Sequence, residues 1–169
     1  MTRIALLDDY QNIALEMADW SGLPGSPETV AFTDHLDAED ALVERLESFD
    51  VVMAMRERTP FPASLLGRLP NLKLLVTAGM RNASIDVAAA RANGVTVCGT
   101  DGQPHPTAEL AWGLIISLMR DIPREDRAVR DGQWQQGIGL GLSGRTLGML
   151  GLGRRSEEHT SELQSPCNL

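Results

Sequence analysis

The chain has 169 residues with 15 basic and 23 acidic side chains, which gives a formal net charge of −8 at pH 7. This acidic balance, with no basic run longer than two residues, excludes the electrostatic footprint of a protein that binds nucleic acid or an anionic membrane surface. The sequence also shows no apolar run near the ~20 residues of a membrane span and no secretory signal at its start, so we expect a cytoplasmic protein whose ligands are small molecules.

Short apolar runs alternate with amphipathic stretches through the first hundred residues. The runs predict five strands, at 4–7, 29–32, 51–55, 72–78 and 95–98. Between them, apolar positions at three and four spacing predict four helices, at 13–20, 38–49, 62–69 and 85–93. Such alternation is typical of a parallel sheet covered by helices on both faces. We therefore expect an α/β fold with a flavodoxin-like strand order.

The segment 101–106 interrupts this rhythm, because two prolines and a glycine in six residues suit neither a helix interior nor a central strand. It predicts a hinge between a first domain, 1–103, and a second that begins at 104. The helix expected from Thr107 to Arg120 is apolar around nearly its whole circumference, which favours burial between domains. A more polar helix near 124–130 and a glycine-rich stretch then lead to a terminal strand.

That terminal strand, near 146–150, runs into half of a dinucleotide-binding loop. Gly151 and Gly153 occupy the first two glycine positions of Gly-x-Gly-x-x-Gly, and Ser156 stands at the third. We expect 104–154 to be the truncated start of a Rossmann domain. Residues 155–169 have no apolar period and resemble one translated reading frame of a sequencing-library adapter, so we interpret them as an adapter-derived tail.

In an open parallel sheet, ligands bind beyond the carboxyl ends of the strands. After the fourth predicted strand, Gly79, Met80 and Arg81 form a small-residue loop before a helix, and backbone N–H groups there could bind a carboxylate. The alternative is an ordinary turn in which Ser84 caps the helix. Arg56, after the third strand, is a weaker candidate for the same anion, since surface ion pairing is its commoner role.

Other polar residues give weaker signals. Asp8 and Asp9, after the first strand, could bind a divalent cation, but capping of the next helix is favoured. His105, between two prolines, is interpreted as a loop residue, and Cys98 as part of the core. Since Cys98 is the only cysteine before residue 155, we expect neither a disulfide nor a metal site.

Four segments carry a resemblance to a known family: 72–86, 89–97, 106–114 and 144–154. In this order they resemble the D-isomer-specific 2-hydroxyacid dehydrogenases, a group that includes phosphoglycerate dehydrogenases. The resemblance implies that the main chain of Gly79, Met80 and Arg81 binds the substrate carboxylate. It also implies NAD as cofactor, with a set of cofactor-binding residues: Thr107, Gly151, Gly153 and Arg154.

The sequence departs from the family pattern at several positions. Arg81, Ala83 and Ser84 stand where many members have glycine and an Asp-Asn pair, so the substrate stays open. The family's catalytic arginine, glutamate and histidine all follow the pyrophosphate loop, and the acidic residue that would separate NAD from NADP lies ~20 positions further on. We therefore assign no catalytic residue to this chain.

The resulting hypothesis is an N-terminal fragment of an NAD-dependent oxidoreductase that acts on the CH–OH group of a 2-hydroxy or 2-keto acid. The fragment itself would be inactive, and its full-length form would be a homodimer. One alternative is a dinucleotide-binding regulatory relative without catalysis. Another is a receiver-type signalling module, suggested by Asp8 and Asp9, although Met55 and Arg56 stand where its third strand would need an aspartate.

Overall fold

The computed structural model describes residues 1–103 and 105–150, so Gly151, Gly153, Arg154 and the predicted tail 155–169 lie outside the described residues. The chain divides into two compact units, Met1–Gly102 and Gln103–Leu169.

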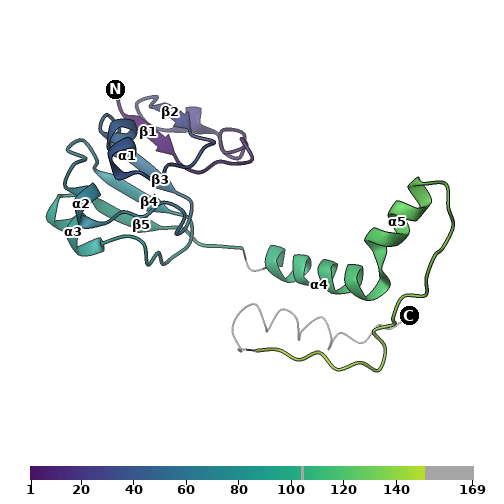
Figure 1. Cartoon of the computed structure of the whole chain (residues 1–169). Coiled ribbons are helices and arrows are strands. Elements are labelled where there is room, and N and C mark those ends of the chain that lie inside the picture. Colours follow the sequence, from purple (N-terminus) through teal and green to yellow (C-terminus); the bar gives the residue numbers. More distant parts are fainter. Residues whose placement is uncertain (104, 151–169) are drawn as a thin grey trace. The chain divides into compact units, whose positions relative to one another are not determined.

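The first unit contains one five-stranded sheet whose strand order is β2-β1-β3-β4-β5, with every neighbouring pair parallel (Figure 1). Its strands are β1 (Arg3–Leu6), β2 (Glu28–Ala31), β3 (Val51–Ala54), β4 (Leu74–Thr77) and β5 (Thr96–Gly99). The flavodoxin-like order expected from the alternating sequence pattern is confirmed. Parallel strands need crossover connections, and each amphipathic stretch from 38 onward supplies one.

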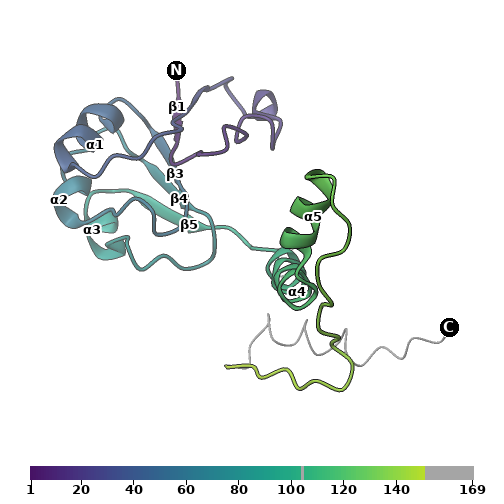
Figure 2. The same cartoon turned by 45° about the vertical axis from the view of Figure 1, so that its right-hand side comes forward.

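Three helices connect these strands: α1 (Glu39–Leu46), α2 (Ala63–Leu66) and α3 (Val87–Ala92). They lie along the same side of the sheet in both views (Figures 1 and 2), as right-handed crossovers that step in one direction from β2 to β5 require. The core lies between these helices and the sheet, where Val52, Leu75 and Phe61 are fully buried.

The helix expected at 13–20 does not form, so the expectation of helices on both faces of the sheet is wrong for this unit. The segment contains turns and a three-residue 3₁₀ helix, η1 (Trp20–Gly22). Asn12 has a left-handed backbone, with φ +54°. Ile13, Leu15 and Met17 are exposed, so an α-helix here would have no buried apolar face to stabilise it.

The second unit contains α4 (His105–Arg120) and α5 (Ile122–Arg130), joined at Asp121, whose φ is +55°. Helix α4 begins earlier than expected, at His105, so the interpretation of His105 as a loop residue is wrong. Pro106 lies in the first turn of the helix, where a missing N–H costs no hydrogen bond. Leu110, Leu114 and Leu118, spaced four residues apart, are exposed. Among the residues that the structure describes, the burial expected around the whole of this helix is therefore not seen.

The terminal strand expected near 146–150 is also absent, since residues 131–150 contain turns and extended chain without strand pairing. A strand needs a neighbour to satisfy its backbone groups, and the described part of this unit contains no other strand. The extended chain instead contacts α4, where the N–H of Leu140 donates to the carbonyl of Met119 at 2.6 Å.

Leu75 provides a test of the core. Its side chain in β4 is 0 % exposed, so Leu75→Ala should leave a cavity and lower the free energy of unfolding by about 2–5 kcal/mol. Met17→Ala, at a side chain that is 74 % exposed, is the control and should change it by less than about 0.5 kcal/mol. Urea denaturation followed by circular dichroism measures both, and equal losses would contradict the position of Leu75.

Candidate functional site

Three loops meet beyond the carboxyl ends of β3, β4 and β5, where the sequence predicted a binding site. Gly79 lies in the loop after β4 with φ +99°, a left-handed conformation that favours glycine. A Cβ atom at Gly79 would lie 3.1 Å from Nη1 and 3.6 Å from Cζ of Arg56, which follows β3. The guanidinium of Arg56 therefore lies over Gly79, and the structure brings these two predicted residues together.

Gly99, the last residue of β5, forms the other side of this loop. A Cβ atom there would lie 2.7 Å from the carbonyl oxygen of Gly79 and 2.9 Å from Cα of Met80. Only glycine allows so close an approach of two backbones. Sequence reasoning missed Gly99, although a glycine that ends an apolar strand is a recognised signal for a close backbone contact.

The backbone N–H groups of the loop differ in their availability. The N–H of Gly79 already donates to Oγ1 of Thr100 at 3.0 Å. The N–H groups of Met80 and Arg81 donate to no backbone carbonyl of the described residues, and both side chains are exposed. These two N–H groups are therefore the donors that remain open to a ligand. Thr100, which sequence reasoning also missed, accepts through its hydroxyl oxygen and can still donate its own proton.

Ser84 does not cap the helix that follows, so that expectation is wrong. Helix α3 begins at Val87, and the carboxylate of Asp86 accepts from the N–H of Ala89 at 2.8 Å. A parallel bridge between Phe61 and Ile85 keeps the preceding residues extended. The loop amides therefore lie several residues before a short helix, and an anion bound there would depend on these amides and on nearby cationic side chains rather than on the helix dipole.

A cavity of about 340 Å³ borders the same loop. Met80, Arg81 and Asn82 line one part of it, while Ile85 and Val97 supply apolar surface. A ligand whose anionic end contacts the loop amides could place a small apolar group in this cavity.

Cys98, in edge strand β5, is exposed, so the prediction that it belongs to the core is wrong.

A second polar cluster lies at the carboxyl ends of β1 and β2. The carboxylate of Asp8 is 2 % exposed and contacts His35 Nδ1 at 2.7 Å, while Thr59 Oγ1 donates to it at 2.8 Å. Arg58 Nη1 donates to the carbonyl oxygen of Asp8 at 2.9 Å. These contacts join the loops after β1, β2 and β3, and the last of these loops also carries Arg56.

The carboxylate of Asp9 bonds to the chain that follows it. Its two oxygens accept from the N–H groups of Ile13 at 3.1 Å and Ala14 at 2.9 Å. Because no helix forms at 13–20, the expectation that Asp9 caps a helix is wrong, and these hydrogen bonds stabilise a turn instead. Across residues 1–103 and 105–150, no cluster of three or more His, Cys, Asp or Glu side chains is arranged to bind a metal ion.

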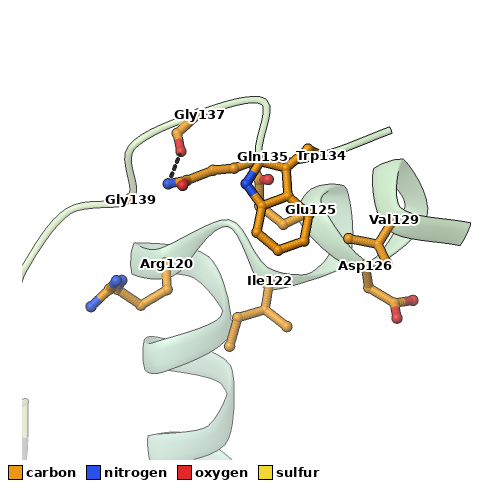
Figure 3. A pocket seen from close by; sticks show the side chains of 9 residues that line it. All are labelled: Arg120, Ile122, Glu125, Asp126, Val129, Trp134, Gln135, Gly137 and Gly139. Carbon is orange, nitrogen blue, oxygen red and sulfur yellow. Dashed lines mark hydrogen bonds between the residues drawn. The ribbon is translucent and has the colours of Figure 1, made fainter. Parts of the chain in front are cut away.

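The second unit contains a cavity of about 620 Å³ between the end of α4, α5 and the segment after Gly132 (Figure 3). Ile122, Val129 and Trp134 give it an apolar character. Glu125 also lines it, but Oε2 of Glu125 accepts from the N–H of Gln136 at 2.9 Å and so fixes the extended segment. None of the candidate residues that the structure describes lines this cavity. Thr107, the candidate that lies in this unit, is exposed in the first turn of α4.

Comparison with known proteins identifies the family. Residues 4–165 match the family model described as D-isomer specific 2-hydroxyacid dehydrogenase, catalytic domain. The chain belongs to this family. The match continues past Arg154 into the predicted tail, and the origin of that tail stays a prediction. Membership of this family argues against the receiver-type alternative. The carboxylate of Asp8 also contacts His35 and Thr59 in the folded chain.

Among curated proteins, the chain is 33% identical over 129 residues to hydroxypyruvate reductase of Thermotoga maritima, covering 75% of this chain and 42% of the relative. It is 35% identical over 125 residues to D-3-phosphoglycerate dehydrogenase of Bacillus subtilis, covering 72% and 23%. The chain thus spans less than half the length of these relatives.

Among solved structures, a phosphoglycerate oxidoreductase from Vibrio cholerae matches with a TM-score of 0.78 and 38% identity, over 95% of this chain and 53% of that one. D-lactate dehydrogenase from Escherichia coli has a TM-score of 0.78 at 21% identity, over 96% of this chain and 52% of that one, and this similarity shows the fold alone.

Of the helices that the structure describes, none combines the length and apolar character that a membrane crossing requires.

The Asp8–His35 pair predicts a pH dependence of stability. The hydrogen bond to Asp8 raises the pKa of His35, burial opposes this, and the negative charges of Asp8 and Asp37 raise it further. Since the folded pKa lies above the unfolded value, the stabilisation is fully present below the ordinary histidine pKa of about 6.5 and is lost as pH rises through the folded pKa. His35→Gln should therefore destabilise the chain more at acidic than at alkaline pH.

Urea denaturation of the wild-type and His35→Gln chains between about pH 5.5 and 8.5 measures this difference, a window that spans the ordinary histidine pKa. A destabilisation by His35→Gln that is independent of pH would show that the charge of His35 does not contribute.

Proposed function

We propose that this chain is the N-terminal part of an NAD-dependent dehydrogenase that transfers a hydride between C2 of a D-2-hydroxy acid and the nicotinamide. Membership of the family supports the reaction class, and the relatives named above include enzymes of hydroxypyruvate and 3-phosphoglycerate. The single observation that carries the proposal for this chain is the loop after β4, where open amides lie beside a guanidinium.

In this proposal, the substrate carboxylate binds to the N–H groups of Met80 and Arg81. Gly79 contributes its left-handed conformation and leaves room for Arg56, whose positive charge attracts the anion. The hydroxyl of Thr100 is a further donor if its proton turns toward the carboxylate. Charge-assisted hydrogen bonds of this kind are shorter and roughly twice as strong as neutral ones.

The cofactor assignment rests on the resemblance. Thr107, Gly151, Gly153 and Arg154 would contact NAD, with 1–103 as the substrate domain and 104–154 as the start of the Rossmann domain. Within the described residues only Thr107 belongs to this set, and residues 131–150 form no strand, so these residues do not by themselves constitute a nucleotide site. A cytoplasmic location and a full-length homodimer are part of the same proposal.

The polypeptide of residues 1–169 should show no turnover. The proposed hydride transfer needs a complete nucleotide site and the catalytic arginine, glutamate and histidine that the family places after the pyrophosphate loop. The assay mixes this chain with NADH and a panel of glyoxylate, pyruvate and hydroxypyruvate, and follows the NADH absorbance. Oxidation of NADH by this chain would contradict the fragment hypothesis.

Sequencing the locus past Arg154 tests the prediction that 155–169 derive from an adapter. It also distinguishes a dehydrogenase from a dinucleotide-binding regulatory relative without catalysis. The expected reading frame restores a glycine at position 156 and continues into the catalytic residues. A frame that lacks those residues would favour the regulatory relative, and a frame that encodes residues 155–169 as they stand would refute the adapter origin.

In the complete enzyme, Met80→Pro should raise KM for the hydroxy acid by about tenfold or more. The substitution removes one backbone N–H, a hydrogen bond to a charged group is worth roughly 1.5–3 kcal/mol, and about 1.4 kcal/mol corresponds to a factor of ten. Met80→Ala keeps the N–H and serves as the matched control. Steady-state kinetics with both variants measure the effect, and an unchanged KM in Met80→Pro would refute the role of this amide.

A further inference from the structure

The side chain of Asn82 joins the two loops that carry the candidate site. Its Nδ2 donates to the carbonyl oxygen of Arg56 at 2.6 Å and to Oγ1 of Thr77 at 2.9 Å, and its Oδ1 accepts from the N–H of Ser84 at 2.9 Å. Thr77 is the last residue of β4 and is 3 % exposed, so one end of this network lies on a rigid, buried strand. Asn82 thereby fixes the backbone of Arg56 relative to the sheet.

The backbone of Arg56 needs such support. Its φ is +53°, a left-handed conformation that side-chain-bearing residues adopt at a cost and that persists only where the surroundings enforce it. The turn itself is closed by a hydrogen bond from the N–H of Arg58 to the carbonyl of Met55, which is long at 3.3 Å. The shorter contact from Asn82 is therefore the stronger local restraint on the peptide group of Arg56.

This conformation decides where the guanidinium lies. The direction of a Cα–Cβ bond follows from φ and ψ, so relaxation of Arg56 to negative φ would turn its side chain away from Gly79. In the structure, Nη1 of Arg56 lies 3.1 Å from the position that a Cβ of Gly79 would occupy. The cation is thus directed at the same loop that presents the open amides of Met80 and Arg81.

We propose that Asn82 is a positioning residue that keeps the guanidinium of Arg56 beside the carboxylate-binding amides of Met80 and Arg81. This inference rests on the proposed function, because the ligand is the carboxylate assigned there. Asn82 would not contact the anion, since both ends of its amide are already bonded to protein groups. Its effect on binding would pass through Arg56.

The first experiment observes the position of Arg56 directly in the chain of residues 1–169. In the wild-type chain, nuclear Overhauser contacts should join the guanidinium protons of Arg56 to the α-protons of Gly79. Asn82→Ala should abolish these contacts. The matched control is Asn71→Ala, because Asn71 Nδ2 also donates to a backbone carbonyl of another segment, that of Glu47, at 2.7 Å. Contacts that persist unchanged in Asn82→Ala would overturn the inference.

The second experiment measures binding by titrating the amide resonances of Met80 and Arg81 with glycolate, the smallest 2-hydroxy carboxylate, and with uncharged glycolamide. Glycolate alone should give saturable shifts in the wild-type chain. Asn82→Ala should weaken glycolate binding by about tenfold, a loss typical of one charge-assisted interaction. In the Arg56→Met background, Asn82→Ala should weaken it by less than about twofold, because coupled residues are not additive.

These outcomes distinguish failure of the proposed carboxylate site from failure of the positioning role of Asn82. Absence of saturable glycolate binding to the wild-type chain would refute the proposed carboxylate site, and the Overhauser contacts would still decide whether Asn82 positions Arg56. Equal weakening by Asn82→Ala in both backgrounds would show that Asn82 acts on the loop without Arg56, which overturns the inference and leaves the carboxylate site intact. Asn71→Ala should leave glycolate binding unchanged.

Discussion

The candidate site depends on the parallel register of β3, β4 and β5. Ala54 pairs with Thr77, and Thr77 pairs with Gly99, so the three strands end at the same level. Arg56 and Gly79 each follow their paired residue by two positions, which makes them neighbours across the edge of the sheet. A slip of one residue would turn every side chain of a strand to the other face and separate these two groups. The buried residues Val52 and Leu75 oppose such a slip, because it would expose them.

Close backbone contact then converts neighbouring loops into one site. Glycines at 79 and 99 remove the side chains that would keep the loops apart, and the polar side chains of Asn82 and Thr100 satisfy backbone groups that the irregular chain leaves unpaired. The Asp8 cluster has a similar effect on the far end of the loop that carries Arg56. The left-handed backbone conformation of Arg56, which is energetically costly, is thus stabilised by hydrogen bonds from several neighbouring segments.

The elements that the sequence predicted well are those determined by local pattern. Apolar runs located the five strands, and their alternation with amphipathic stretches predicted the strand order. The proximity of Arg56 to the loop of Gly79 also followed, because carboxyl ends of parallel strands share an edge. The identity of the family depended on four sequence segments rather than on any physical derivation.

The errors arose where a contact distant in sequence overrides local preference. Ser84 fits the pattern of a helix cap, but the bridge between Ile85 and Phe61 extends the chain and transfers capping to Asp86. Cys98 lies in an apolar run, yet its strand is at the edge of the sheet. The structural roles of Asn82 and Thr100 are set by partners 26 and 21 residues away, which no spacing rule could have indicated.

The proposed carboxylate binding and the proposed hydride transfer depend on different parts of the chain. All groups proposed to contact or position the carboxylate lie within Met1–Gly102, which has its own sheet and core. The second unit shows the opposite condition: α4 exposes Leu110, Leu114 and Leu118, and the chain after α5 forms no strand pairs up to residue 150. An apolar helix face and an unpaired extended segment both require partners to be stable. The groups of the proposed anion site therefore belong to one sheet and core, while the proposed nucleotide site, which needs several paired strands and the glycine loop, includes residues outside those that the structure describes.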